Sequence, residues 1–324
     1  MYIAPDKQNW NGRVDSIHDE HSFRIHQMIQ LKNMKELSEN VNAYNIVGFE
    51  SDEGVRRNKG RQGAAKGPNA IKKMLAKLPY HMDSANIVDV GNVRCEGREL
   101  EKAQKELGNT VTHLLKRAGV PIILGGGHET LYGHYLGVRE FLGSDVSLGV
   151  INIDAHFDMR NEDIPSSGTM FKQILDKDNK AGYLCLGIQE LGNTKSLFKT
   201  ADAYDCTYVY EDSIADNHFQ TTFQTIDDFA EAYDYVMLTL CTDAITSSDA
   251  PGVSAPSPFG MEPKTVRTLI RYISSKDNIT SFDISEVNPT VDENEKTVRL
   301  AALLVADVMK HFNGDRIKAR MIDS

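Results

Sequence analysis

The amino-acid sequence predicts an α/β protein built around a mostly parallel sheet with helices on both faces. Short runs rich in Val, Ile and Leu alternate along the chain with longer amphipathic or polar segments, and Gly, Asp or Asn bounds the runs. Strands that alternate with helices form parallel sheets, because each crossover helix packs back onto a face of the sheet. The hydrophobic fraction of 40% is ample for the buried core of such a fold.

Each element of this fold is predicted from a short stretch of sequence. Eight apolar runs are predicted to be buried strands: 44–49, 85–91, 120–127, 146–154, 182–188, 206–210, 234–241 and 279–287. Helical patterns predict six helices: 68–78, 99–118, 130–142, 194–203, 262–274 and 293–312. No Pro/Ser-rich linker or repeat interrupts the alternation, so we expect residues 44–324 to form one domain. Residues 1–43 are interpreted as a polar N-terminal leader, which could wrap the surface or mediate oligomer contacts.

Composition argues against several classes of partner and compartment. The net charge of -10 argues against nucleic acid or an anionic membrane as the main partner, since both need clustered Lys and Arg. The N-terminus is too polar for a signal peptide, and no run of about 18 apolar residues exists. Four widely spread cysteines without a CxxC motif fit a reducing compartment. We therefore expect a cytoplasmic protein that acts on a small molecule.

Side chains of the kind that bind metals follow three of the predicted strands. They are His128 in ILGGGHET, Asp154, His156 and Asp158 in INIDAHFDMR, and Cys241 and Asp243 in LTLCTDA. On extended chain, alternate residues share one face, so the Asp-x-His-x-Asp spacing directs three side chains to one place. Mixed imidazole and carboxylate ligands suit manganese, zinc or iron. The alternative, in which each Asp caps a helix and each His is a satisfied core residue, suits any one of them but not the combination.

Four motifs carry a resemblance to a known family. The chain contains GGGHE, DAHFD, CTD followed by SDAPGVSAP, and DISEVNP, with a matching stretch at 52–75. In this order they resemble the arginase/agmatinase (ureohydrolase) family. The resemblance implies a three-layer α/β/α sandwich around an eight-stranded, mostly parallel sheet, a homo-oligomer, and two Mn²⁺ per subunit. It implies that one ion is held by His128, Asp154, Asp158 and Cys241, and the other by Asp154, His156, Cys241 and Asp243.

Three positions depart from the family pattern, which usually has Asp at each. They are Gly127, Cys241 and Thr246. A thiolate at position 241 is softer than a carboxylate and would shift the metal preference toward Zn²⁺ or Fe²⁺. Gly127 removes an acid that would help to orient a ligand. These departures keep open a catalytically impaired homologue that is retained for binding or assembly.

The substrate is predicted from the residues that follow the metal motif. Arg160 stands where arginase-like enzymes have Asn, and a guanidinium there is a bidentate clamp for a carboxylate. Phe171 stands where arginases carry a proton-shuttling His. DAHFDMRN followed by SSGTMF is similar to the formimidoylglutamase branch, which implies hydrolysis of N-formimidoyl-L-glutamate to L-glutamate and formamide. Asn58 and Arg61 are further candidates for substrate contact. Another carboxylated guanidino- or amidino-acid, such as guanidinobutyrate, is the alternative substrate, and an ordinary surface ion pair is the alternative role for either arginine.

The resemblance also implies two catalytic carboxylates. A hydroxide produced by the metals would attack the formimidoyl carbon, and Asp158 would pass the water's proton to the leaving nitrogen. Glu286, at the end of the last predicted strand, would pair with the cationic amidinium of the substrate. A carboxylate at a helix N-terminus is the alternative role of Glu286.

Overall fold

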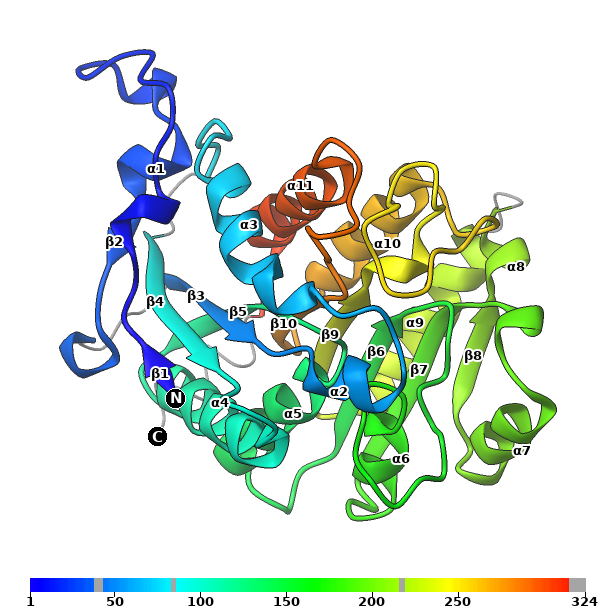
Figure 1. The fold of residues 1–324 in the computed structure, drawn as a ribbon. Helices are drawn as coiled ribbons and strands as arrows, with labels where there is room; N and C mark the ends of the chain where they lie inside the picture. The colour runs from blue at the N-terminus through cyan, green and yellow to red at the C-terminus, as the bar shows by residue number, and fades with distance from the viewer. Residues whose placement is uncertain (38–42, 83–85, 216–218, 315–324) are drawn as a thin grey trace.

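The computed structural model describes residues 1–37, 43–82, 86–215 and 219–314, and in these residues it contains one ten-stranded sheet (Figure 1). Its longer strands are β3 (Ala43–Glu50), β4 (Asn86–Arg94), β5 (Gly119–Leu124), β6 (Leu148–Ile153), β7 (Ala181–Ile188), β8 (Thr207–Tyr210), β9 (Tyr235–Cys241) and β10 (Ile279–Ser285). They match the eight predicted strands, although residue 85 of the prediction lies outside the described residues. The two additional strands are β1 (Tyr2–Ile3) and β2 (Gln30–Leu31).

The sheet therefore has ten strands rather than the expected eight, because the N-terminal leader adds β1 and β2 to the edge strand β4. The order is β1-β4-β3-β5-β10-β9-β6-β7-β8, and β2 also pairs with β4. Every strand pair is parallel except β1 with β4. The leader is also anchored by apolar side chains, since Trp10 and Ile25 are buried in the main core. Residues 38–42 of the predicted leader lie outside the described residues.

Helices cover both faces of the sheet, as a three-layer sandwich requires. Six helices match the predicted ones: α3 (Gly67–Leu75), α4 (Leu100–Leu115), α5 (Thr130–Leu142), α7 (Lys195–Ala203), α10 (Pro263–Ser274) and α11 (Lys296–His311). Five were not predicted: α1 (Ile25–Met28), α2 (Glu53–Arg57), α6 (Met170–Leu175), α8 (Glu211–Ala215) and α9 (Phe219–Ala232). No helix in the described part of the chain has the length and apolarity needed to cross a membrane.

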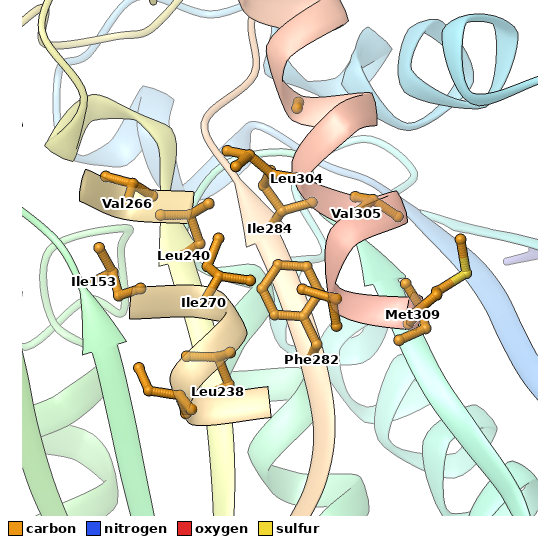
Figure 2. Packing of buried hydrophobic residues seen from close by; sticks show 14 of the residues in the cluster. Ile153, Leu238, Leu240, Val266, Ile270, Phe282, Ile284, Leu304, Val305 and Met309 are labelled. Atoms are coloured by element: carbon orange, nitrogen blue, oxygen red, sulfur yellow. The ribbon is translucent and has the colours of Figure 1, made fainter. Parts of the chain in front are cut away.

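The core is divided into two clusters, one on each face of the sheet. Figure 2 shows part of the first cluster, in which Phe282 and Ile284 of β10 pack against Ile270 of α10 and Val305 of α11. The second cluster lies beneath α4, α5, α6 and α7 and includes Leu107 and Ile174. Because parallel strands bury both faces, their sequences are continuous apolar runs. This explains why the strands were predictable from sequence.

Candidate metal centre

Four neighbouring strands bring the candidate ligands together at the carboxyl edge of the sheet. The strands β5, β10, β9 and β6 are adjacent in that order. In this register Ile284 pairs with Leu124, Ser285 with Cys241, and Ile153 with Leu240, so these strands end at the same level. Ligands of open parallel sheets bind at such an edge. The topology therefore places the residues that follow these strands beside one another.

The candidate ligand atoms lie close enough to one another to share an ion. His128 Nδ1 lies 3.0 Å from Asp154 Oδ2 and 3.0 Å from Asp158 Oδ2. His156 Nδ1 lies 3.3 Å from Asp243 Oδ2 and 3.6 Å from Asp154 Oδ1. Two groups of three residues place their ligand atoms within 4.8 Å of one another. The first group is His128, Asp154 and Cys241, and the second is Asp154, His156 and Asp243. Asp154 is common to both groups.

The two groups contain five of the six ligands that the family resemblance implied. Cys241 belongs to the first group, and Asp158 to neither, although its carboxylate contacts His128. The extended-chain argument for residues 154–158 was wrong. The segment turns after β6, because Asp154 Oδ1 accepts a hydrogen bond from the backbone N–H of His156 at 2.8 Å, and Asp158 has a φ of 49°. The side chains converge through this turn rather than through the alternation of a strand.

Two buried carboxylates of the site each have an oxygen without a hydrogen-bond partner in the described chain. Oε2 of Glu286 and Oδ1 of Asp243 are buried without a hydrogen-bond partner among the described residues. Burial, together with Asp243 and Glu129, raises the pKa of Glu286 to about 8. Burial and the charge of Asp154 raise the pKa of Asp158 to about 6. A buried carboxylate without compensating charge is costly, so this donor set fits divalent cations that would neutralise it.

Imidazole and thiol groups respond to the same charges. Burial alone would lower the pKa of His128, but hydrogen bonds to Asp154 and Asp158 raise it well above the ordinary value. Burial, reinforced by Asp154 and Asp243, raises the pKa of the Cys241 thiol. A bound cation reverses both effects, since ligation requires a neutral imidazole and favours a thiolate.

A buried relay orients His128, and sequence reasoning missed it. Thr239 Oγ1 donates to Asp283 Oδ1 at 2.8 Å, and Asp283 Oδ2 contacts His134 Nδ1 at 2.7 Å. The Thr239 hydroxyl is thereby left to accept from His128 Nε2, 3.1 Å away. A proton on Nε2 leaves the Nδ1 lone pair free for a metal. The signal in the sequence was a polar residue inside each of two apolar strands, because a buried polar group needs a partner.

A cavity of about 240 Å³ opens onto the ligands. It is lined by Asn58, Gly60, His128, His156, Asp158, Arg160, Ser167, Gly192, Asn193, Leu197, Cys241, Asp243, Ser254, Ala255 and Glu286. The predicted contacts Asn58 and Arg160 therefore lie on its wall, where Asn58 Nδ2 donates to Ser167 Oγ at 3.2 Å. The Arg160 side chain is 54% exposed, and its nearest carboxylate, that of Glu162, is 4.0 Å away. Its guanidinium is thus available to a ligand.

Arg61 is placed differently from the other candidates. It is not among the described residues that line the cavity. Its guanidinium donates to the backbone carbonyls of Ser254, through Nε at 3.0 Å, and Val253, through Nη2 at 2.5 Å. Ser254 itself lines the cavity. In this structure the Arg61 guanidinium is thus bound to the backbone next to the cavity wall.

Phe171 occupies a buried position behind His128. Its ring stacks on Tyr183 with a centroid distance of 3.7 Å and meets the His128 ring edge-on at 6.2 Å. An apolar, fully buried side chain cannot carry protons. Residue 171 therefore does not serve as a proton shuttle in this site.

The fold and the site define an α/β/α protein with a cluster of imidazoles and carboxylates suited to two divalent cations. The Arginase family model matches residues 42–310, and the chain belongs to this family, as its motifs predicted. Its curated relatives include the "Formimidoylglutamase" of Geobacillus sp. (strain WCH70), 56% identical over 316 residues and 97% of each chain. The "Formimidoylglutamase" of Clostridium tetani (strain Massachusetts / E88) is 41% identical over 95% of each chain.

Two solved structures share the fold. Formimidoylglutamase from Bacillus subtilis superimposes with a TM-score of 0.78 at 23% identity, covering 91% of this chain and 95% of that one. Trypanosoma cruzi formiminoglutamase with two Mn²⁺ ions gives a TM-score of 0.75 at 23% identity, covering 86% of this chain and 98% of that one. At this identity the similarity bears on the fold alone.

Proposed function

We propose that this chain hydrolyses N-formimidoyl-L-glutamate to L-glutamate and formamide with two Mn²⁺ per subunit. The name and high identity of the curated relatives support the reaction, and the exposed guanidinium of Arg160 in the cavity wall, which suits a carboxylate, carries the assignment. The substrate has carboxylates at one end and a cationic formimidoyl group at the other. The site offers a guanidinium at its rim and unpartnered acid near the ligand cluster, which matches both ends of this molecule.

The proposed metal ligands are the six residues predicted from the sequence. One ion would be held by the group His128, Asp154 and Cys241 together with Asp158, and the other by the group Asp154, His156 and Asp243 together with Cys241. When bound, the pair of cations lowers the pKa of a water so that hydroxide forms near neutral pH. Cys241 makes Zn²⁺ or Fe²⁺ the alternative metals, since a thiolate is a softer ligand than a carboxylate.

The chain's own side chains bind the substrate and move its protons. Arg160 and Asn58 hold the glutamate end at the rim, and the free Oε2 of Glu286 pairs with the amidinium. Water adds to the formimidoyl carbon, and the bond from that carbon to the glutamate nitrogen breaks. Asp158, with its carboxyl facing the cavity, takes the proton of the water and gives it to that nitrogen. Formamide and glutamate leave. Arg61 acts through Ser254, which it supports.

The test measures product release by thiol-protected, manganese-loaded protein: glutamate from N-formimidoyl-L-glutamate and, in parallel, urea from arginine, agmatine and guanidinobutyrate. We expect turnover of N-formimidoyl-L-glutamate alone. Faster turnover of guanidinobutyrate would reassign the protein to guanidino-acid hydrolysis. No turnover of any substrate, with two ions per chain verified, would support the impaired homologue that Cys241 and Thr246 suggest.

We further propose that the protein works in the cytoplasm as a homo-oligomer, with residues 44–324 as one domain to which the segment 1–43 adds its two short strands. All four cysteines are free, which suits a reducing compartment. Light scattering on the purified protein tests the oligomer directly, because a mass of 36.1 kDa in solution would contradict it.

A further inference from the structure

A buried carboxylate next to His128 has no role in the steps above. Glu129 is fully buried, and its Oε1 accepts hydrogen bonds from Ser51 Oγ at 3.0 Å and from the backbone N–H of Gly54 at 2.9 Å. Its Oε2 has no partner among the described residues. A buried carboxylate is retained where its hydrogen bonds fix something that matters, because burying it is costly.

The Glu129 carboxylate occupies the space that a side chain at position 127 would need. A Cβ atom placed on Gly127 would lie 2.1 Å from Glu129 Oε2 and 2.4 Å from Val55 Cγ2, both far inside van der Waals contact. The side chain of an aspartate at 127 would therefore start in the space that the Glu129 carboxylate and Val55 fill. The glycine at 127 does not leave this space without an acid, because Glu129, two residues further along the chain, places its carboxylate there.

The two hydrogen bonds of Glu129 lead to the substrate side of the cavity. Gly54 lies in α2, and the residue that ends this helix, Asn58, lines the cavity. A Cβ atom on Gly54 would lie 2.6 Å from Glu129 Cδ, so the start of α2 and the carboxylate are in direct contact. The backbone N–H of Gly127 donates to Ser51 O at 2.9 Å. The loop that bears His128 and the segment that leads to Asn58 are thus held together at this point.

We infer that Glu129 is a positioning residue that supplies, from position 129, the buried carboxylate that locks the start of α2 and sets Asn58 in the substrate cavity. Positions 127 and 129 share one carboxylate site, so an acid at either position satisfies it and acids at both collide. Loss of Glu129 leaves Gly54 N–H and Ser51 Oγ without their acceptor and loosens the wall that carries Asn58. The substrate's KM rises, whereas the metal ligands, to which the Glu129 carboxylate makes no hydrogen bond among the described residues, keep their affinity.

Four proteins test the shared site: the wild type, Glu129→Ala, Gly127→Asp and the double variant. For Glu129→Ala we expect KM to rise about tenfold, with kcat and the Mn²⁺ dissociation constant each within about threefold of wild type. Gly127→Asp lowers the melting temperature, because its side chain meets the existing carboxylate. In the double variant the new aspartate replaces the missing one, and KM returns to within about threefold of wild type. Glu129→Gln, which keeps the acceptor for Gly54, retains a near wild-type KM and carries the test if Glu129→Ala does not fold.

A double variant whose KM is as high as that of Glu129→Ala would overturn the inference. So would a tenfold change in Mn²⁺ affinity at constant KM, since Glu129 would then act on the ligands. The KM readout rests on the proposed function, but the melting temperatures do not. If the wild type releases no glutamate, the proposed function fails, and the shared site still requires the double variant to melt above Gly127→Asp, because it lacks the clash with the Glu129 carboxylate.

Discussion

The polar cluster around Lys72 at the β4 edge and the cluster around Asp154 at the carboxyl edge are both buried in the same sheet, but they balance their charges differently. Lys72 Nζ donates to Asp89 Oδ1 at 2.6 Å, Asn92 Oδ1 at 2.7 Å and Gly91 O at 3.1 Å, which uses all three of its protons. The other Asp89 oxygen accepts from Trp10 Nε1 at 2.7 Å. This cluster satisfies itself and ties the N-terminal segment to the sheet.

The cluster at the carboxyl edge leaves atoms unsatisfied. Glu286 and Asp243 each keep a buried oxygen without a partner in the described chain, and a buried thiol adds a further group that burial disfavours as an anion. Binding sites commonly sacrifice stability in this way for function. In this molecule the cluster with a complete set of internal partners is structural, whereas the surplus of negative charge lies where the candidate metal ligands gather.

Removing the ligand common to both groups should give the largest effect. In Asp154→Asn we expect kcat/KM to fall at least about ten-thousandfold, equivalent to about 5.5 kcal/mol of transition-state stabilisation, together with loss of bound metal. Metal analysis after dialysis and the glutamate-release assay measure both. Two ions per chain with near wild-type turnover would mean that the surplus of acid at this edge serves some other purpose.

Substitution of Lys72 should disrupt the cluster whose polar groups all have partners, and it should affect stability rather than activity. Lys72→Met leaves Asp89 as a buried, uncompensated charge, which costs about 3–5 kcal/mol of unfolding free energy. Urea denaturation measures the loss, and kcat/KM at a temperature where the variant is folded should not change. Lys73→Met is the matched control, because the neighbouring Lys73 is exposed and its loss should be nearly neutral. Equal stability of the two variants would contradict a structural role for the Lys72 cluster.

Substitution of Glu286 should lower activity without lowering stability, the reverse of what we expect for Lys72. In Glu286→Gln we expect kcat/KM to fall about a hundredfold, because a neutral amide replaces the acid that pairs with the amidinium. The metal-free variant should melt at the same temperature as the wild type or higher, since Gln keeps the acceptor for His128 N–H and removes a carboxyl that burial disfavours. Glu262→Gln, at an exposed position, controls for loss of an acid elsewhere. A large drop in the melting temperature would place Glu286 with Lys72 as a structural residue.

The longer strands were predictable from the sequence, but the sheet edge was not. The eight parallel strands are continuous apolar runs, such as YVMLTLC in β9, whereas β1 and β2 have two residues each and no such pattern. The helix α9 was missed because its sequence, FQTTFQTIDDFAEA, is rich in Thr, Asp and Phe, which are mediocre helix formers. Its apolar residues nevertheless recur at helical spacing, at Phe219, Phe223, Ile226 and Phe229.

The site likewise contains residues whose positions were predictable from the sequence and residues whose positions were not. Residues at strand ends, such as His128 and Asp243, are positioned by the topology, and the strand pattern was enough to bring them together. Arg61 and Glu129 depend on contacts between segments far apart in the chain, with Ser254 and Gly54 respectively. No local pattern encodes those contacts. The turn at Asp158 was missed for a different reason, because a positive φ at a non-glycine residue has no clear signal in the sequence.

Substitution of Arg160 in the outer wall of the cavity should give the smallest effect on kinetics, because its guanidinium is partly solvated. Arg160 is 54% exposed, so its contacts with a substrate carboxylate compete with water. In Arg160→Ala we expect KM for N-formimidoyl-L-glutamate to rise about thirtyfold with kcat nearly unchanged, which corresponds to about 2 kcal/mol of binding free energy from a charged hydrogen-bonded pair. Arg299→Ala, at an exposed position on α11, controls for loss of positive charge. An unchanged KM would contradict the carboxylate clamp while leaving the metal cluster, and the contrast with Lys72, intact.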